Sequence, residues 1–97
     1  MTDLEMTRLC AEARELDWCG AKYSDGLHVF TGRGNYHKLY DPLHDDAQAM
    51  ALVKKFAVCI TLLANTYWEV VSVMTTARSV DLNRAIVECV AKMQRTR

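Results

Sequence analysis

The sequence predicts a small α+β domain in which helices alternate with antiparallel hairpins. Apolar residues recur every three or four positions in segments that begin near residues 3, 45 and 80, which is typical of amphipathic helices. Two other segments, 21–40 and 58–74, are rich in β-branched and aromatic residues interrupted by turn residues, as hairpins are. The 97 residues, 51% of them hydrophobic and 25% charged, suffice for one hydrophobic core and predict a single domain over residues 1–97.

The first predicted helix covers about residues 3–16. Thr2 and Glu5 fit a capping box, in which the hydroxyl and the carboxylate accept hydrogen bonds from backbone N–H groups at the helix start. One face then carries apolar residues at spacings of three and four: Met6, Leu9, Cys10, Ala13 and Leu16. We expect Trp18-Cys19-Gly20 to close this helix, because glycine readily adopts the left-handed backbone of a helix end.

The segment after this helix predicts a hairpin. Ala21–Tyr23 and Leu27–Phe30 have the composition of two short strands around Ser24-Asp25-Gly26, a turn in which glycine accepts a positive φ. A second turn-rich stretch, Thr31–Asn35, leads into Tyr36–Tyr40. The sequence allows this last stretch to be a short edge strand or an extended arm.

A second helix is predicted over about residues 45–56. Asp45 and Asp46 suit its N-terminus, where carboxylates accept backbone hydrogen bonds and meet the positive end of the helix dipole. Its apolar residues surround most of the circumference: Ala47, Ala49, Met50, Ala51, Leu52, Val53 and Phe56. We therefore expect it to be the central helix.

A second hairpin and a third helix complete the predicted domain. The runs 58–63 and 67–74, separated by Ala64-Asn65-Thr66, have the composition of paired strands. Apolar residues lie on both faces of the second run, which predicts helices or a partner on each side. The last helix begins at about residue 80 or 81 and ends at about 94. The predicted architecture is a small three-layer α-β-α sandwich, ordered helix-hairpin-helix-hairpin-helix around an antiparallel sheet.

The composition restricts the cellular compartment in which we expect the protein. No uninterrupted apolar stretch exceeds five residues, far short of the roughly 20 that cross a bilayer, so we expect no membrane partner. Acidic and basic residues throughout the first 20 positions do not fit a signal peptide. We expect a cytoplasmic protein whose four cysteines are reduced and mostly buried.

Basic and acidic residues are equal in number over the whole chain, but they are distributed unevenly between its two halves. Twelve Lys and Arg residues match twelve Asp and Glu residues, so the overall basic field of a nucleic-acid binder is missing. Residues 1–48 contain nine acidic and five basic residues, whereas residues 49–97 contain three acidic and seven basic ones. The two halves either attract each other within the fold or present opposite faces to a partner.

We expect neither a metal site nor a cofactor. The histidines and cysteines lack the spacings that present two ligands to one zinc ion, and no calcium-loop pattern surrounds Asp41, His44, Asp45 and Asp46. Helix capping explains those acidic residues better. The Gly32-Arg33-Gly34 segment fits a tight turn better than a phosphate loop, because no lysine and helix start follow it.

No motif of an enzyme is present. Cys19 could pair with His28 or His37 for nucleophilic catalysis, since all three belong to the first hairpin region, but nothing in the sequence brings them into contact. We therefore do not expect an enzyme.

Aromatic and basic side chains alternate in the first hairpin region. This composition is typical of a protein-binding hot spot or of a platform that stacks single-stranded bases. The alternative is that Tyr36 and Tyr40 cover the sheet edge while Lys38 shields it from pairing. The candidate interaction residues are Tyr23, Arg33, Tyr36, His37, Lys38 and Tyr40.

Several motifs together resemble one family. They are Leu16-Asp17-Trp18 at the end of the first helix, the stretch from Tyr40-Asp41-Pro42 to Ala49, Trp68 in the central hairpin, and Asn83–Val90 in the last helix. Over roughly residues 4–93 the chain is similar to the phage ABA sandwich domain proteins. The resemblance implies an α-β-α layered fold and a bacteriophage or prophage source, and it implies no reaction.

Small phage accessory proteins commonly bind a host machine. We therefore expect a stoichiometric binder of a host protein or complex, including an inhibitor of a defence complex, in the host cytoplasm. The sequence also permits a homodimer that forms across strand 67–74, if one face of the sheet is left uncovered. The alternative function is a nucleic-acid-associated regulator that uses the basic second half: Lys54, Lys55, Arg78, Arg84, Arg95 and Arg97.

Overall fold

The computed structural model describes residues 1–17, 26–30 and 37–96. Its elements are α1 (Asp3–Ala13), β1 (His28–Phe30), β2 (His37–Leu39), α2 (Asp46–Phe56), β3 (Cys59–Leu63), β4 (Tyr67–Val71), β5 (Thr76–Ser79) and α3 (Leu82–Arg95). The strands form two antiparallel sheets, β1-β2 and β3-β4-β5. The predicted α+β class is confirmed. None of the described helices is long and apolar enough to span a bilayer.

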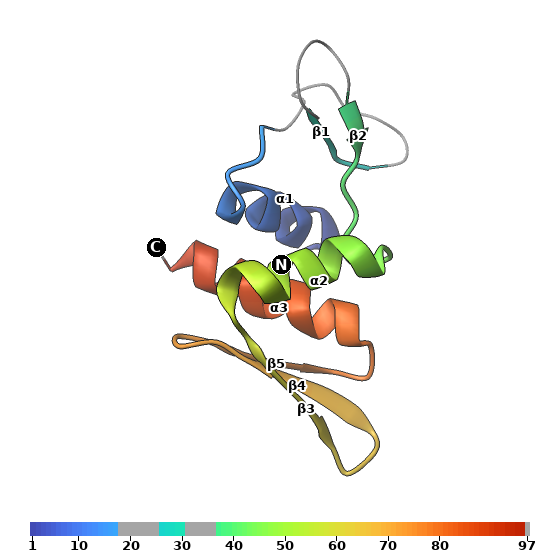
Figure 1. Cartoon of the computed structure of the whole chain (residues 1–97), viewed down its shortest axis with the longest axis vertical. Helices are drawn as coiled ribbons and strands as arrows, with labels where there is room; N and C mark the ends of the chain where they lie inside the picture. The colour runs from blue at the N-terminus through green and yellow to red at the C-terminus, as the bar shows by residue number, and fades with distance from the viewer. Residues whose placement is uncertain (18–25, 31–36, 97) are drawn as a thin grey trace.

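The layers follow one another along the 45 Å long axis of the molecule. Figure 1 shows the β1-β2 ribbon at one end, the three helices in the middle and the β3-β4-β5 sheet at the other end. Helices therefore cover only one face of the larger sheet, whereas the predicted α-β-α order placed helices on both. The reason is that the two hairpins form separate sheets and leave the centre to the helices.

The central helix is α3, not α2 as expected. α3 packs against α1 and α2 on one side and against β4 and β5 on the other. Seven of its residues are buried, namely Ala85, Ile86, Val87, Cys89, Val90, Ala91 and Met93. In α2 only Ala49 and Leu52 are buried, so its wide apolar surface is half exposed. Burial on several sides is what holds α3 between two layers.

Helix α1 ends earlier than predicted. Thr2 caps it as expected, accepting a hydrogen bond from the Glu5 N–H at 3.1 Å. At the other end, Glu15 N–H donates to Glu12 O and Leu16 N–H donates to Ala11 O, both at 2.9 Å. This is a Schellman motif, and it places Glu15 in the left-handed region with φ 58°. The helix is thus closed by a glutamate, before the glycine that was expected to do so.

Helix α2 agrees with its predicted bounds. Asp45 is the N-cap, and its Oδ1 accepts a hydrogen bond from the Gln48 N–H at 3.0 Å. Lys54 and Lys55 lie in the last turn, where positive charge meets the negative end of the helix dipole. Ala57 ends the helix in the left-handed conformation and leads the chain into β3.

In the first strand pair, β1 pairs with a different segment from the one predicted. β1 confirms the strand expected near residues 27–30, and it pairs with β2, with Val29 opposite Lys38. The predicted partner 21–23 and both predicted turns, apart from Gly26, lie outside the described residues. Of the two alternatives for residues 36–40, the strand is the observed one, over His37–Leu39.

The second hairpin is confirmed, and a third strand joins it. β3 and β4 pair in register from Cys59 opposite Val71 to Leu63 opposite Tyr67, around a turn in which Ala64 and Asn65 have positive φ. β4 stops at Val71, because the Ser72 side chain accepts hydrogen bonds from the N–H groups of Met74 and Thr75 and turns the chain. The returning strand β5 was not predicted.

Glu15 offers a test of the helix end. A left-handed backbone is unfavourable for any residue with a Cβ, by roughly 1–2 kcal/mol, and costs glycine much less. Glu15→Gly is therefore expected to raise the free energy of unfolding by about 1 kcal/mol in urea titrations. Glu15→Ala is the matched control, because it removes the charge and keeps the Cβ, and it should give no such gain. A glycine variant less stable than the alanine variant would contradict this helix end.

Candidate functional site

The predicted contact segment is only partly described, and one of its residues belongs to the core. Tyr23, Arg33 and Tyr36 lie outside the described residues, so their role stays a prediction. His37 and Lys38 are in β2, and Lys38 is exposed. The Tyr40 side chain is 1% exposed, so it cannot contact a partner. We therefore assign Tyr40 to the core and correct the predicted contact surface accordingly.

Tyr40 is an unusual core residue because its hydroxyl is buried. In the described part of the chain no group meets this hydroxyl in good hydrogen-bond geometry, although the Arg14 guanidinium lies close to it. Burial, followed by the nearby Cys10 thiol, raises the pKa of Tyr40 to about 12, although the Arg14 guanidinium acts in the opposite direction. The tyrosine is therefore a neutral packing residue at physiological pH.

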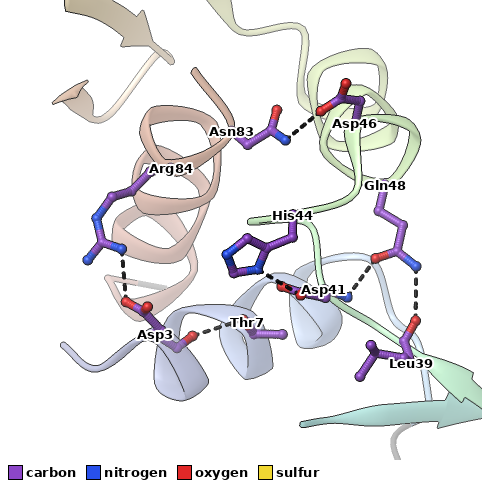
Figure 2. A network of polar contacts seen from close by, with 9 residues as sticks. All are labelled: Asp3, Thr7, Leu39, Asp41, His44, Asp46, Gln48, Asn83 and Arg84. Carbon is purple, nitrogen blue, oxygen red and sulfur yellow. Dashed lines mark hydrogen bonds and ion pairs between the residues drawn. The ribbon is translucent and has the colours of Figure 1, made fainter. Parts of the chain in front are cut away.

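The acidic residues around α2 each have a structural partner, and Figure 2 shows those of Asp41 and Asp46. Asp41 Oδ2 lies 2.8 Å from His44 Nδ1, and Asp46 Oδ1 accepts a hydrogen bond from Asn83 Nδ2 at 2.8 Å. Asp45 caps α2. Within the described ranges, no group of three or more His, Cys, Asp or Glu residues is placed to hold a metal ion. Asp45 therefore caps a helix as predicted, whereas the side chains of Asp41 and Asp46 pair with His44 and Asn83 instead.

The same network ties the helix N-termini to the small β-ribbon. Gln48 Oε1 accepts a hydrogen bond from the Asp41 N–H at 2.6 Å, and Gln48 Nε2 donates to Leu39 O at 3.1 Å. Arg84 Nη1 lies 2.9 Å from Asp3 Oδ1 and so links α3 to α1. Figure 2 shows these side chains converging from α1, α2, α3 and the end of β2. These contacts hold α1, α2, α3 and the end of β2 in a defined relative orientation.

A cavity of about 210 Å³ adjoins this network, and Asp41 and His44 are among its lining residues. The pair could relay a proton, but catalysis by acyl transfer also needs an activated nucleophile. The lining hydroxyls are poor candidates: Thr7 Oγ1 donates to Asp3 O at 2.8 Å, and Tyr40 has the raised pKa given above. We therefore assign the network a structural role.

The described cysteines are free thiols in two environments. Cys10 and Cys89 are buried, whereas Cys59 is exposed on β3. Burial, with a smaller contribution from Cys89, raises the pKa of Cys10 to about 12, so Cys10 stays a neutral thiol rather than a nucleophile. Cys19, the cysteine considered for catalysis, lies outside the described residues.

The larger sheet presents a face that no described helix covers. Val70 lies between Ile60 of β3 and Ala77 of β5, and the burial of Val70 and Ala77 identifies the side of the sheet that packs on α3. Alternate residues point to the other side, which we call the open sheet face. It consists of Cys59, Thr61, Leu63, Tyr67, Glu69, Val71, Thr76 and Arg78. In Figure 1 the helices all lie on the opposite side of this sheet.

The open sheet face combines a charged pair with apolar surroundings. Arg78 binds Glu69 across the strands, with Nη2 at 2.7 Å and Nε at 2.8 Å from Oε2. Tyr67 and Val71 flank this pair on β4. Beyond the strand ends, Val73 is 99% exposed and Val80 is 79% exposed. Exposed apolar side chains around a few polar groups are typical of protein contact surfaces.

Sequence analysis missed this surface although it contained one signal for it. Residues 67–74 are apolar on both faces, which predicted a second layer or a partner for each face. The choice between the two depended on where the helices pack, and the periodicity of one strand does not contain that information.

Replacement of Tyr40 by phenylalanine tests its buried hydroxyl. Leaving a buried polar group without a partner costs about 1–3 kcal/mol, so Tyr40→Phe is expected to raise the free energy of unfolding by about 1 kcal/mol at neutral pH. Urea titration at pH 7 measures this. A variant less stable than wild type would show that the hydroxyl has a favourable partner.

Stability is also expected to fall at alkaline pH. The unfolded chain loses protons from cysteine and tyrosine near their ordinary pKa values of 9.0 and 10.0, while folded Cys10 and Tyr40 keep theirs until about pH 12. The contribution is thus fully present below about pH 9 and is lost as the pH rises toward 12. Urea midpoints across this range should fall, and less steeply in Tyr40→Phe above pH 10. A constant midpoint would contradict the raised pKa values.

The open sheet face is thus the surface on which a functional assignment depends. No family model matches the chain, and comparisons with curated proteins and with solved structures give no significant match. The assignment therefore comes from the geometry and chemistry of the chain itself.

Proposed function

We propose that this protein acts by stoichiometric binding to another protein and that the open sheet face is its contact surface. The supporting observation is that the sheet has a helix layer on one face only. Apolar side chains remain exposed beside it, beyond the strand ends, at Val73, Met74 and Val80. Exposed apolar area of this kind is buried favourably when a partner covers it.

The partner class follows from the family resemblance. A chain similar to the phage ABA sandwich domain proteins is proposed to work inside an infected bacterium, where its target is a host protein or complex. Inhibition of a defence machine is the specific form of this proposal. A preorganised surface loses less conformational entropy on binding, and α3 packs behind the sheet and supports it.

The β1-β2 ribbon is a second candidate contact surface. It carries the exposed Lys38 and connects to the predicted contact residues Tyr23, Arg33 and Tyr36. It lies at the opposite end of the long axis from the larger sheet (Figure 1). The two surfaces are therefore separate, and substitutions on one leave the other intact.

Binding to nucleic acid is the less favoured function. Arg78 pairs with Glu69 and Arg84 with Asp3, so two of the six basic residues considered for it are neutralised. Arg97 lies outside the described residues. Lys54, Lys55 and Arg95 remain, in the last turns of α2 and α3. A complex that depends on such residues weakens steeply as salt rises, so the absence of a salt-sensitive mobility shift would exclude this function.

Substitution of Val73 tests the proposed surface. The tagged protein is used to capture host proteins, and each captured protein is purified and titrated with wild type and variants. Val73→Asp places a charge in the contact and is expected to weaken the complex at least tenfold, about 1.4 kcal/mol. Since Val73 is almost fully exposed, the substitution should leave the unfolding midpoint unchanged.

Leu4→Asp is the matched control for this experiment. Leu4 is also an exposed apolar residue, but it lies on α1, which is separated from the sheet by α3. This variant should bind like wild type. If Val73→Asp and Tyr67→Ala both bind normally while Lys38→Ala does not, the contact surface is the β1-β2 ribbon instead.

A further inference from the structure

The two edges of the larger sheet differ in how they are protected. An edge strand exposes unpaired N–H and C=O groups, and proteins usually block such an edge with charge, proline, a bulge or a covering element. β5 is blocked in this way. It carries Arg78, it packs against α3, and Lys92 Nζ donates to its Thr76 O at 3.3 Å. A further strand at this edge would have to displace the lysine.

Among the described elements, the β3 edge has none of these protections. Its five residues, Cys59-Ile60-Thr61-Leu62-Leu63, include no charge, proline or glycine. Most of them are exposed, and Leu62 remains 44% exposed although it points to the helix side of the sheet. The β3-β4 hairpin projects away from the helices at the end of the long axis (Figure 1). An apolar, accessible edge is a template for another strand.

The sequence of β3 is complementary to itself in the antiparallel direction. With a two-fold axis at Thr61, Cys59 of one copy lies opposite Leu63 of the other, and Ile60 lies opposite Leu62. Each of these pairs is apolar, and the threonines face each other at the axis, which is a favourable cross-strand pair. Just outside the ladder, Val58 meets Ala64, so no like charges are brought together.

We propose that β3 pairs antiparallel with β3 of a second copy, which joins two three-stranded sheets into one continuous six-stranded sheet. The interface is isologous, as in most two-fold dimers. A second copy is favoured over an unrelated strand because the same five residues supply both sides of the ladder. This dimer goes beyond the proposed function and does not rest on it. It uses the edge of the sheet and brings two open sheet faces side by side.

Charge at the axis tests the register directly. Thr61 lies opposite its own copy, so Thr61→Lys or Thr61→Glu places like charges in contact and is expected to raise the dimer dissociation constant at least tenfold. An equimolar mixture of the two variants pairs lysine with glutamate and should restore the dimer. Molar mass from sedimentation equilibrium, measured from micromolar to millimolar protein, gives the result. Wild type should approach twice the mass of the monomer.

The matched control is Thr76→Lys on the opposite edge. Thr76 is also an exposed threonine on the open sheet face, and this variant should dimerise like wild type. A wild-type protein that stays monomeric overturns the proposal, and so does a Thr76→Lys variant that dissociates while Thr61→Lys does not. Two monomeric charge variants that fail to pair when mixed also overturn it.

Hydrogen exchange on wild type provides a measurement that depends on no variant. Amide protons of Cys59–Leu63 should exchange more slowly as protein concentration rises, whereas those of Thr76–Ser79 should not change. Unchanged exchange in β3 at concentrations that give a dimer overturns the proposed interface. These measurements use the protein alone, so a monomeric wild type overturns the dimer and leaves the proposed contact surface standing. A dimer in which Val73→Asp still binds the captured protein overturns that contact surface and leaves the dimer standing.

Discussion

Burial of α3 on several sides is the constraint on which the rest of the structure depends. α3 packs on α1 and α2 through one surface and on β4 and β5 through another. Its small residues Ala85 and Ala91 are fully buried and allow neighbouring elements to approach closely. Once this helix occupies the centre, the strands must lie outside it. The uncovered face and the free edge of the larger sheet are both consequences of that arrangement.

The elements with strong local signals were predictable. Asp45 before an apolar stripe identified α2, and the β-branched runs identified β3 and β4. Two boundaries were not, because local rules were overridden. Glu15 adopts a left-handed backbone that sequence rules reserve for glycine, and Ser72 ends β4 through its side chain. β5 was missed because Ala77 is its only apolar residue.

The layer order and the candidate site were harder to predict, for one physical reason. A strand that is apolar on both faces can bury them against two helix layers, against one helix layer and a partner, or against another copy of the chain. The signal that decides the matter is in α3, where Val87, Val90 and Ala91 are buried in addition to Ile86, Cys89 and Met93. Tyr40 illustrates the same difficulty. It belongs to a segment whose aromatic and basic residues are typical of a contact surface, yet Tyr40 itself lies in the core.

The centre of this protein is formed by α3, which follows every other described element along the chain. The Cys10 thiol donates to the Val87 carbonyl, a contact between residues 77 positions apart. During synthesis, α1, α2 and the sheet therefore have no core to pack on until residues 82–95 emerge from the exit tunnel. The core forms only after α3 has emerged, and the apolar β3 strand is left exposed until then. Chaperone binding to nascent chains would be concentrated in that interval.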